Sequence, residues 1–475
     1  MDDTRSRIAH LYRRAGFGAR PDELDAAVGK GYEATVEALL SGLRSADPAG
    51  DAVAPPQLAV YHAPPTSTSA DPLAKLAANR QQQMNQNQEI LALQGWWLNR
   101  MIVTSTPLRE KLTLLWHNHF ATGFVKVRNA ALMYRQNQLF RSMGSGNFEV
   151  LTQAIAKDPA MMYWLDTQTD VASHPNENFA RELMELFTLG IGNYTEDDVK
   201  AGARCFTGWA FNPMTGDYVL RARLHDSGWK TLLGQTGAWG GEDVVRIVTH
   251  HPASLKWIPA KLWSHLAYPV STDDPIVAGL AAGYQRDLDI TSLLRAIFLH
   301  PGFTSPAARG GLVKQPIEYV VGIARAFGLD ASGQQVRDLD PAGGVAGLTP
   351  GRAANGTTTT LPPRRATKPV ALPGLLRTLA QEPFDPPNVA GWPQNEYWLT
   401  TATAQLRLQY GYAVGSAVDL SALSALAPAN RADALAHLLS IDGWGPTTAA
   451  ALNHVAADPA TLVALALSTP EYVLN

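Results

Sequence analysis

Cysteine is almost absent from this chain of 475 residues. Cys205 is the only one, so a single chain can form neither an internal disulfide nor a cysteine-rich zinc or iron–sulfur site. Any bound metal must therefore be held by histidine, aspartate or glutamate. We expect Cys205, beside Phe206 in a predicted helix, to be a small core residue rather than a nucleophile.

A strong net charge is also missing. The 39 basic and 42 acidic residues leave a net charge of −3, and no run of lysine or arginine stands out. Such a chain has no field that would gather nucleic acid, so we expect no nucleic-acid partner. No segment reaches the roughly 18 to 20 apolar residues of a membrane span, and the first residues do not resemble a signal peptide. We therefore expect a cytoplasmic protein, or an exported one if the chain is a trimmed form.

The common catalytic motifs are lacking as well. The sequence contains no G-x-S-x-G elbow, no P-loop, no G-x-G-x-x-G and no H-E-x-x-H. Hydrolases with a nucleophile elbow, P-loop and dinucleotide-binding proteins and zincins therefore find no support.

What is present is typical of a helical globular protein. Hydrophobic residues make up 46% and charged residues 17% of the chain. Apolar spacing predicts helices over 22–40, 76–102 and 108–120. We predict a mainly α, multi-helix protein with at most a small β-hairpin near residues 210–224 and a long Gly/Pro/Thr-rich loop at 329–374. We expect three parts. Residues 1–328 form a main helical body that contains the candidate site, residues 329–374 form a long loop or flap, and residues 375–475 form a C-terminal helical part packed on the body.

The densest histidine pair is His117 and His119. On a helix their side chains differ by about 200° of rotation, so they cannot share one ion unless the helix ends there. His119 continues the apolar face of Leu108, Leu112 and Leu115 and should point inward. A core histidine bonded to a backbone carbonyl is the alternative to a metal ligand.

A second candidate group lies in the segment 176–190. Helical spacing places Glu182 and Glu185 on one stripe, and Glu177, Arg181 and Glu185 form a ladder of charges at intervals of four. Two carboxylates one turn apart could hold a cation or act as acid and base. The alternative is an exposed helix with surface ion pairs.

A third group is His225 followed by Asp226. The two residues lie in a predicted turn, and loop residues can aim their side chains freely at a ligand. Of the three groups, this one is the least constrained by regular structure.

Several segments together resemble the bacterial domain-of-unknown-function family eighteen hundred. The matching segments run nearly from end to end: 11–18, 116–120, 176–190, 206–209, 225–234, 251–262, 314–318, 386–393 and 468–472. The resemblance implies an uncharacterised family whose members are often exported. It also implies genes beside those of a second uncharacterised family, similar to alkaline phosphatases and sulfatases. The missing export signal departs from that pattern and leaves room for a specialised cytoplasmic enzyme.

The resemblance strengthens the case for one shared site, because the candidate residues fall in the best-matching segments. In the leading hypothesis His117 or His119, Glu182 and His225 hold one divalent transition metal, such as Fe, Mn, Zn or Cu. A haem with a single axial histidine is the less favoured cofactor.

Three residues complete this hypothesis. Glu185 or Asp226 would orient a ligand or move protons, and Arg181 would hold Glu185 or an anionic substrate. The expected function is that of a metal-dependent enzyme, preferably an oxidoreductase acting on a small molecule. The alternatives are a non-enzymatic binding or scaffold protein with a protein partner, and a metal-free acid–base or hydrolytic enzyme.

Overall fold

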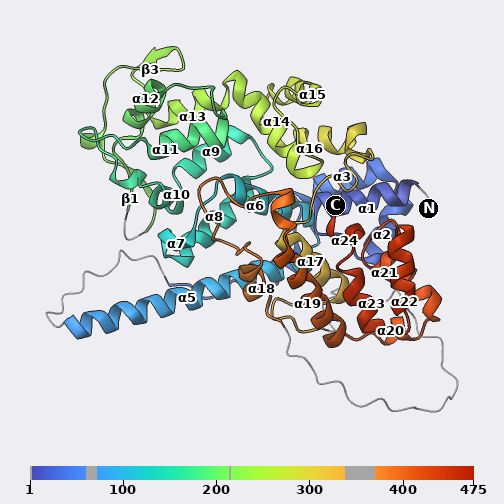
Figure 1. The fold of residues 1–475 in the computed structure, drawn as a ribbon. Coiled ribbons are helices and arrows are strands. Elements are labelled where there is room, and N and C mark those ends of the chain that lie inside the picture. The colour runs from blue at the N-terminus through green and yellow to red at the C-terminus, as the bar shows by residue number, and fades with distance from the viewer. Residues whose placement is uncertain (1–2, 60–71, 213–214, 337–369) are drawn as a thin grey trace.

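The computed structural model describes residues 3–59, 72–212, 215–336 and 370–475. Within these ranges the protein is mainly α-helical, as predicted, and its strands form two antiparallel hairpins (Figure 1). Residues 337–369, most of the predicted loop, lie outside the described residues. The predicted three-part division of the chain stays a prediction.

Four helices precede the long helix α5 (Pro72–Val103): α1 (Asp3–Ala15), α2 (Pro21–Lys30), α3 (Tyr32–Gly42) and α4 (Pro48–Asp51). Gly31 has a φ of 88° and separates α2 from α3, so the predicted single helix over 22–40 is wrong. Glycine adopts positive φ at little cost, and a helix cannot continue through it. The N-terminal half of α5 extends away from the body (Figure 1).

Helix α6 (Pro107–His119) is the central helix of the fold, and nearly all of its residues are buried. It packs against α3 and α8 (Ala130–Met143). Leu108, Leu112 and Leu115 enter one hydrophobic core cluster, whereas Leu114 enters a second. Its polar side chains therefore point into several different environments.

The middle of the chain forms short helices and both hairpins. The helical elements are α7 (Phe124–Val127), α9 (Phe148–Ala156), α10 (Pro159–Trp164), α11 (Glu177–Glu182), the π-helical turn η2 (Leu183–Thr188) and α12 (Glu196–Phe206). The predicted hairpin is confirmed as β1 (Trp209–Phe211) and β2 (Tyr218–Leu220), with Ala210 opposite Val219. A second hairpin, β3 (Lys230–Leu232) and β4 (Gln235–Gly237), was not predicted. Leu233 and Gly234 both have positive φ in its two-residue turn, as tight hairpins require.

The remaining helices complete both core clusters. They are α13 (Gly241–Thr249), α14 (Pro252–Leu266), α15 (Pro275–Tyr284), α16 (Ile290–Leu299), α17 (Pro316–Phe327), α18 (Leu372–Thr378), α19 (Thr401–Ala417), α20 (Ser421–Ser424), α21 (Pro428–Leu438), α22 (Pro446–Val455), α23 (Pro459–Ala466) and α24 (Pro470–Val473). Helices α5 and α17 share a core cluster with these C-terminal helices. Helix α18 begins inside the predicted loop 329–374.

Buried cations join α1 to the C-terminal helices; we call Arg13, Arg14 and Lys314 the junction cluster. The Arg14 guanidinium donates to the backbone carbonyls of Ala267, Ala308 and Asn475, at 3.0, 2.6 and 2.7 Å. The Lys314 ammonium donates to a backbone carbonyl at 2.6 Å and lies over an aromatic ring. A small cavity beside this cluster has a volume of about 10 Å³, room for about one water molecule.

Candidate functional site

His117 lies in a box of aromatic rings. Its side chain is 1% exposed, and its ring centroid is 5.6, 5.4 and 5.5 Å from those of Trp97, Phe384 and Trp392. Burial lowers the pKa of His117 to about 3, so the imidazole is neutral at pH 7. Its Nε2 atom has no hydrogen-bond partner among the described residues.

His119 is half-buried and is thus the less enclosed of the two histidines. Its Nε2 atom lies 2.9 Å from the backbone carbonyl of Phe187 in η2, which confirms the alternative of a histidine bonded to a carbonyl. Burial first, and then the charge on Lys261, lower the pKa of His119 to about 3. Because the neutral ring donates from Nε2, its Nδ1 atom carries the free lone pair.

Of the predicted charge ladder, the pair of Glu177 and Arg181 is present, but Glu185 does not join it. Arg181 binds Glu196 at 2.7 Å and Glu177 at 3.0 Å, whereas Glu185 accepts a hydrogen bond from the Tyr194 hydroxyl. The wider π-helical turn begins at Leu183 and carries Glu185 off the stripe that a continuous α-helix would give. Arg181 therefore does not hold Glu185.

Glu182 is half-buried and forms no hydrogen bond or ion pair with any described residue. Burial first, and then the charge on Glu185, raise the pKa of Glu182. The neighbouring guanidinium of Arg181 acts in the opposite direction but does not cancel this rise.

His225 and Asp226 are bound by the last turn of α12 and by Thr207, the residue that follows it. The Nδ1 atom of His225 lies 2.9 Å from the Thr207 carbonyl, and the Asp226 carboxylate accepts from Arg204 Nε at 2.7 Å. The hydrogen bond from Arg204 lowers the pKa of Asp226. Both side chains therefore have partners nearby in the sequence. These hydrogen bonds explain why a His and an Asp stand in this turn, and no bound ligand is needed to explain them.

The structure does not bring the predicted metal ligands together. In the described ranges, no three histidine, cysteine, aspartate or glutamate side chains are grouped as metal ligands would be. A shared centre of His117 or His119, Glu182 and His225 is therefore not assembled there. The reason is tertiary: His117 faces an aromatic box, His119 faces η2, and His225 faces the end of α12.

A different group of side chains gathers near His119. Helix α14 carries Trp257, Lys261 and His265 at intervals of four, so they share one face of the helix. Trp257 Nε1 donates to the carbonyl of Leu186 at 3.2 Å, directly beside the carbonyl of Phe187 that binds His119. This face of α14 therefore lies against the same π-helical turn. We call His119, Lys261 and His265 the α6–α14 cluster.

Lys261 is the charged member of this cluster. Its ammonium lies 4.5 Å from the centroid of the Trp257 ring, and it forms no hydrogen bond or ion pair with any described residue. Burial lowers the pKa of Lys261. A desolvated ammonium without a counter-charge is a feature of functional sites more often than of surfaces.

His265 is held as a neutral imidazole. Its Nδ1 atom donates to the Lys261 carbonyl at 2.9 Å, and its Nε2 atom faces the side-chain amide of Gln394. Burial, the largest effect, lowers the pKa of His265 to about 4. The sequence prediction missed Lys261 and His265, although the regular spacing of Trp257, Lys261 and His265 was a signal that could have identified them.

A family comparison covers almost the whole chain. The model of DUF1800, described as a protein of unknown function, matches residues 10–474. The chain belongs to the DUF1800 family. This match confirms the resemblance found in the sequence. No curated protein and no solved structure matches the chain.

Membership in DUF1800 assigns no activity, so the function has to be argued from the side chains. Both ends of the α6–α14 cluster fall inside the matched range. Among the described residues, no helix has the length and apolar character needed to cross a bilayer.

Proposed function

We propose that this DUF1800 protein is an enzyme that acts on a small molecule by metal-free acid–base and electrostatic catalysis at the α6–α14 cluster. One observation carries the proposal: the half-buried ammonium of Lys261 has no carboxylate partner in the described structure. A surface lysine would have water, and a structural buried lysine would have a carboxylate or carbonyl oxygen.

The two imidazoles give this ammonium a defined setting. His119 and His265 are neutral at pH 7, because burial lowers their pKa values to about 3 and about 4. They therefore act as fixed hydrogen-bonding groups and add no positive charge. The Nδ1 atom of His119 can accept a hydrogen bond from a substrate hydroxyl or N–H.

The chemistry that suits this arrangement is stabilisation of negative charge on a substrate oxygen. A preorganised ammonium in a site with little water stabilises such charge far more than it would in bulk solvent. We infer a substrate with a carbonyl or a similar oxygen that gains charge in the reaction. Lys261 is the group that binds this oxygen, and His119 orients the substrate.

This proposal replaces the metal-dependent oxidoreductase as the leading function. The metal hypothesis needs His117 or His119, Glu182 and His225 to share one ion, and these side chains face different segments. The α6–α14 cluster contains no carboxylate and only two imidazoles, which is a poor ligand set for a divalent metal.

Lys261 can be tested without knowing the substrate. The reactivity of each lysine toward acetic anhydride is measured by mass spectrometry across a pH series. Lys256, an exposed lysine on the same helix, is the reference. Lys261 should become reactive at a lower pH than Lys256 does, because its ammonium is desolvated. Equal titration of the two lysines would argue against the proposal.

Activity is the second test. Wild-type protein and the Lys261→Met and Lys256→Met variants are screened against carbonyl-containing small molecules. Any turnover should be lost in Lys261→Met and kept in Lys256→Met, with thermal unfolding confirming that both variants fold. Turnover that persists in Lys261→Met would contradict the assignment.

A further inference from the structure

A wide cleft opens beside the N-terminal end of α6, away from the α6–α14 cluster. It lies between the ends of α3, α5 and α8 and the start of α9, and its volume is about 740 Å³. That volume is within the roughly 300 to 1,000 Å³ typical of ligand sites. Four arginines line it: Arg44, Arg100, Arg109 and Arg141. Asp51 is the one carboxylate among its described lining residues.

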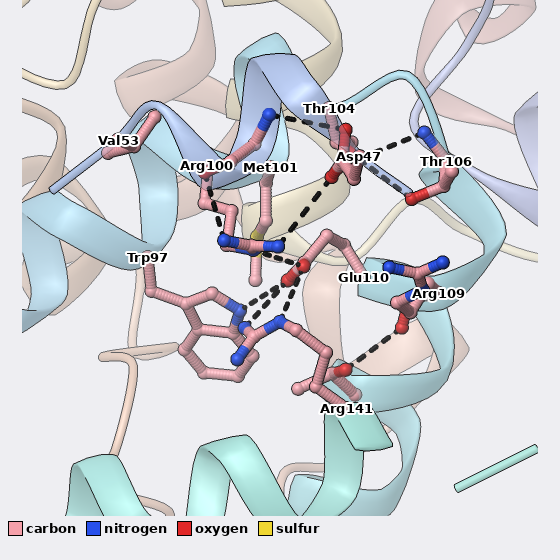
Figure 2. A network of polar contacts seen from close by, with 12 residues as sticks. Asp47, Val53, Trp97, Arg100, Met101, Thr104, Thr106, Arg109, Glu110 and Arg141 are labelled. Carbon is pink, nitrogen blue, oxygen red and sulfur yellow. Dashed lines mark hydrogen bonds and ion pairs between the residues drawn. The ribbon is translucent and has the colours of Figure 1, made fainter. Parts of the chain in front are cut away.

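A buried carboxylate holds two of these arginines in place. Glu110 is 0% exposed, and its oxygens accept from Arg100 Nε at 2.8 Å and from Arg141 Nε and Nη2 at 2.7 and 2.9 Å (Figure 2). The indole N–H of Trp97 donates to the same carboxylate at 3.0 Å. Burial alone would raise the pKa of Glu110, but the guanidiniums of Arg141 and Arg100 lower it below its usual value. Both guanidiniums are therefore fixed in the wall of the cleft.

The other two arginines keep donors available. Arg109 donates from Nε and Nη2 to backbone carbonyls at the end of α3, and its Nη1 group has no partner among the described residues. Arg44 is exposed and forms no hydrogen bond or ion pair with any described residue. These free guanidinium N–H groups are strong, geometrically defined donors for oxyanions.

The charges at the cleft are not balanced. Arg100 is close to Asp51 at 2.7 Å and to the buried Asp47 at 3.7 Å, and Glu110 lies between Arg100 and Arg141. Three carboxylates thus face four guanidiniums, so the group is cationic even when the buried acids are counted. Helix α9 begins at the same cleft with its cap residue Asn147, and the positive end of its dipole adds to this field.

We propose that this cleft binds a small organic anion that carries two or more phosphate or carboxylate groups. Four guanidiniums around a cleft of this volume suit a ligand with several anionic groups better than one small ion. A purely structural role explains Arg100, Arg141 and part of Arg109, but it gives Arg44 nothing to bind. The inference goes beyond the proposed function, since it uses none of His119, Lys261 and His265.

The test is calorimetric titration of the full-length protein with pyrophosphate and, separately, with citrate. Three variants accompany the wild type: Arg44→Ala, Asp51→Asn and Arg223→Ala. Arg223, in the short helix η3 (Ala222–Leu224), is also exposed and without a partner in the described structure, and it is the matched control. Circular dichroism and thermal unfolding establish that each variant folds.

At least one probe should bind wild-type protein, and added salt should weaken that binding. The Arg44→Ala substitution should weaken it roughly tenfold. The Asp51→Asn substitution should strengthen it roughly threefold, because it removes the lining carboxylate. The Arg223→Ala substitution should leave it unchanged. Tighter binding of pyrophosphate would identify the ligand as a phosphate compound, and tighter binding of citrate a carboxylate.

Two outcomes would overturn the inference. One is the absence of binding for both probes at millimolar concentration in folded wild-type protein. The other is an equal loss of affinity in Arg44→Ala and Arg223→Ala, which would show only non-specific attraction to surface charge. Neither outcome affects the α6–α14 cluster, whose tests depend on Lys261.

Discussion

The protein has two clusters of arginines, and they use the same side chain in opposite ways. In the junction cluster, Arg14 Nη2 donates to three backbone carbonyls, and Arg13 and Lys314 line a cavity of about 10 Å³. In the cleft, Arg44 has no partner in the described structure, and the open volume is about 740 Å³. The comparison separates cations that hold the fold together from cations that are available to a ligand.

The difference has a physical basis in what surrounds each charge. Backbone carbonyls accept only from Nη2 of Arg14, and its Nε and Nη1 atoms are buried without a partner among the described residues. Its charge therefore lies in a poorly solvated interior, and burial, as the largest effect, lowers the pKa of Arg14 to about 9. In the cleft, the fully ionised Glu110 holds Arg100 and Arg141, and solvent reaches Arg44. Substitutions in the junction cluster should therefore change the free energy of unfolding, whereas substitution of Arg44 should change the affinity of the cleft for anions.

The largest expected effect is that of Arg14→Met. This change removes the Arg14 donor from three backbone carbonyls, of which that of Ala308 keeps the N–H of Gly311, and we expect the free energy of unfolding to fall by about 4 kcal/mol. Urea denaturation measures the loss, with Arg44→Ala as the control that should leave stability unchanged. A loss for Arg14→Met no larger than that of the control would contradict the structural role of Arg14.

A smaller loss should follow from Glu110→Gln. The amide keeps the shape of the carboxylate but leaves Arg141 without a counter-charge and removes one of the three carboxylates near Arg100, so we expect a loss of about 3 kcal/mol by the same measurement. Glu196→Gln removes an exposed partner of Arg181 and should cause no measurable change. If both variants unfold like the wild type, Glu110 does not organise the cleft.

The smallest effect should appear in the pH dependence of stability. Burial first, and then the charge on Arg13, lower the pKa of Lys314 well below its usual value. Between that lowered pKa and about 10.4, the unfolded chain still holds a proton that the folded protein has released. The free energy of unfolding should therefore rise with pH through this window. Lys314→Met should remove this rise in the part of the window just below a pH of about 10.4, and parallel curves for variant and wild type would refute it.

The sequence predicted the local features of the fold well. The small hairpin near residues 210–224 is confirmed, because neighbouring residues determine it. The break at Gly31 was missed, since the apolar spacing continues through it.

The candidate sites were harder to predict, because their residues converge only in the folded chain. Arg44, Arg100 and Arg141 are far apart in sequence, and nothing in their local patterns points to a common cleft. His117 and His119 were identified as candidates, but the sequence did not show what each side chain contacts. His119 contacts η2 and His117 contacts Trp392, and both partners lie far along the chain. Lys261 and His265 carried a local signal that was missed, the spacing of four residues on α14.

The measurement that tests the central contrast most directly is labelling of native protein with phenylglyoxal, read arginine by arginine by mass spectrometry. Arg44 and Arg109 should react first and be protected by pyrophosphate or citrate, whereas Arg13 and Arg14 should react only after denaturant is added. Equal labelling of the two clusters, or labelling of Arg44 that neither anion slows, would contradict the division between structural and ligand-binding arginines.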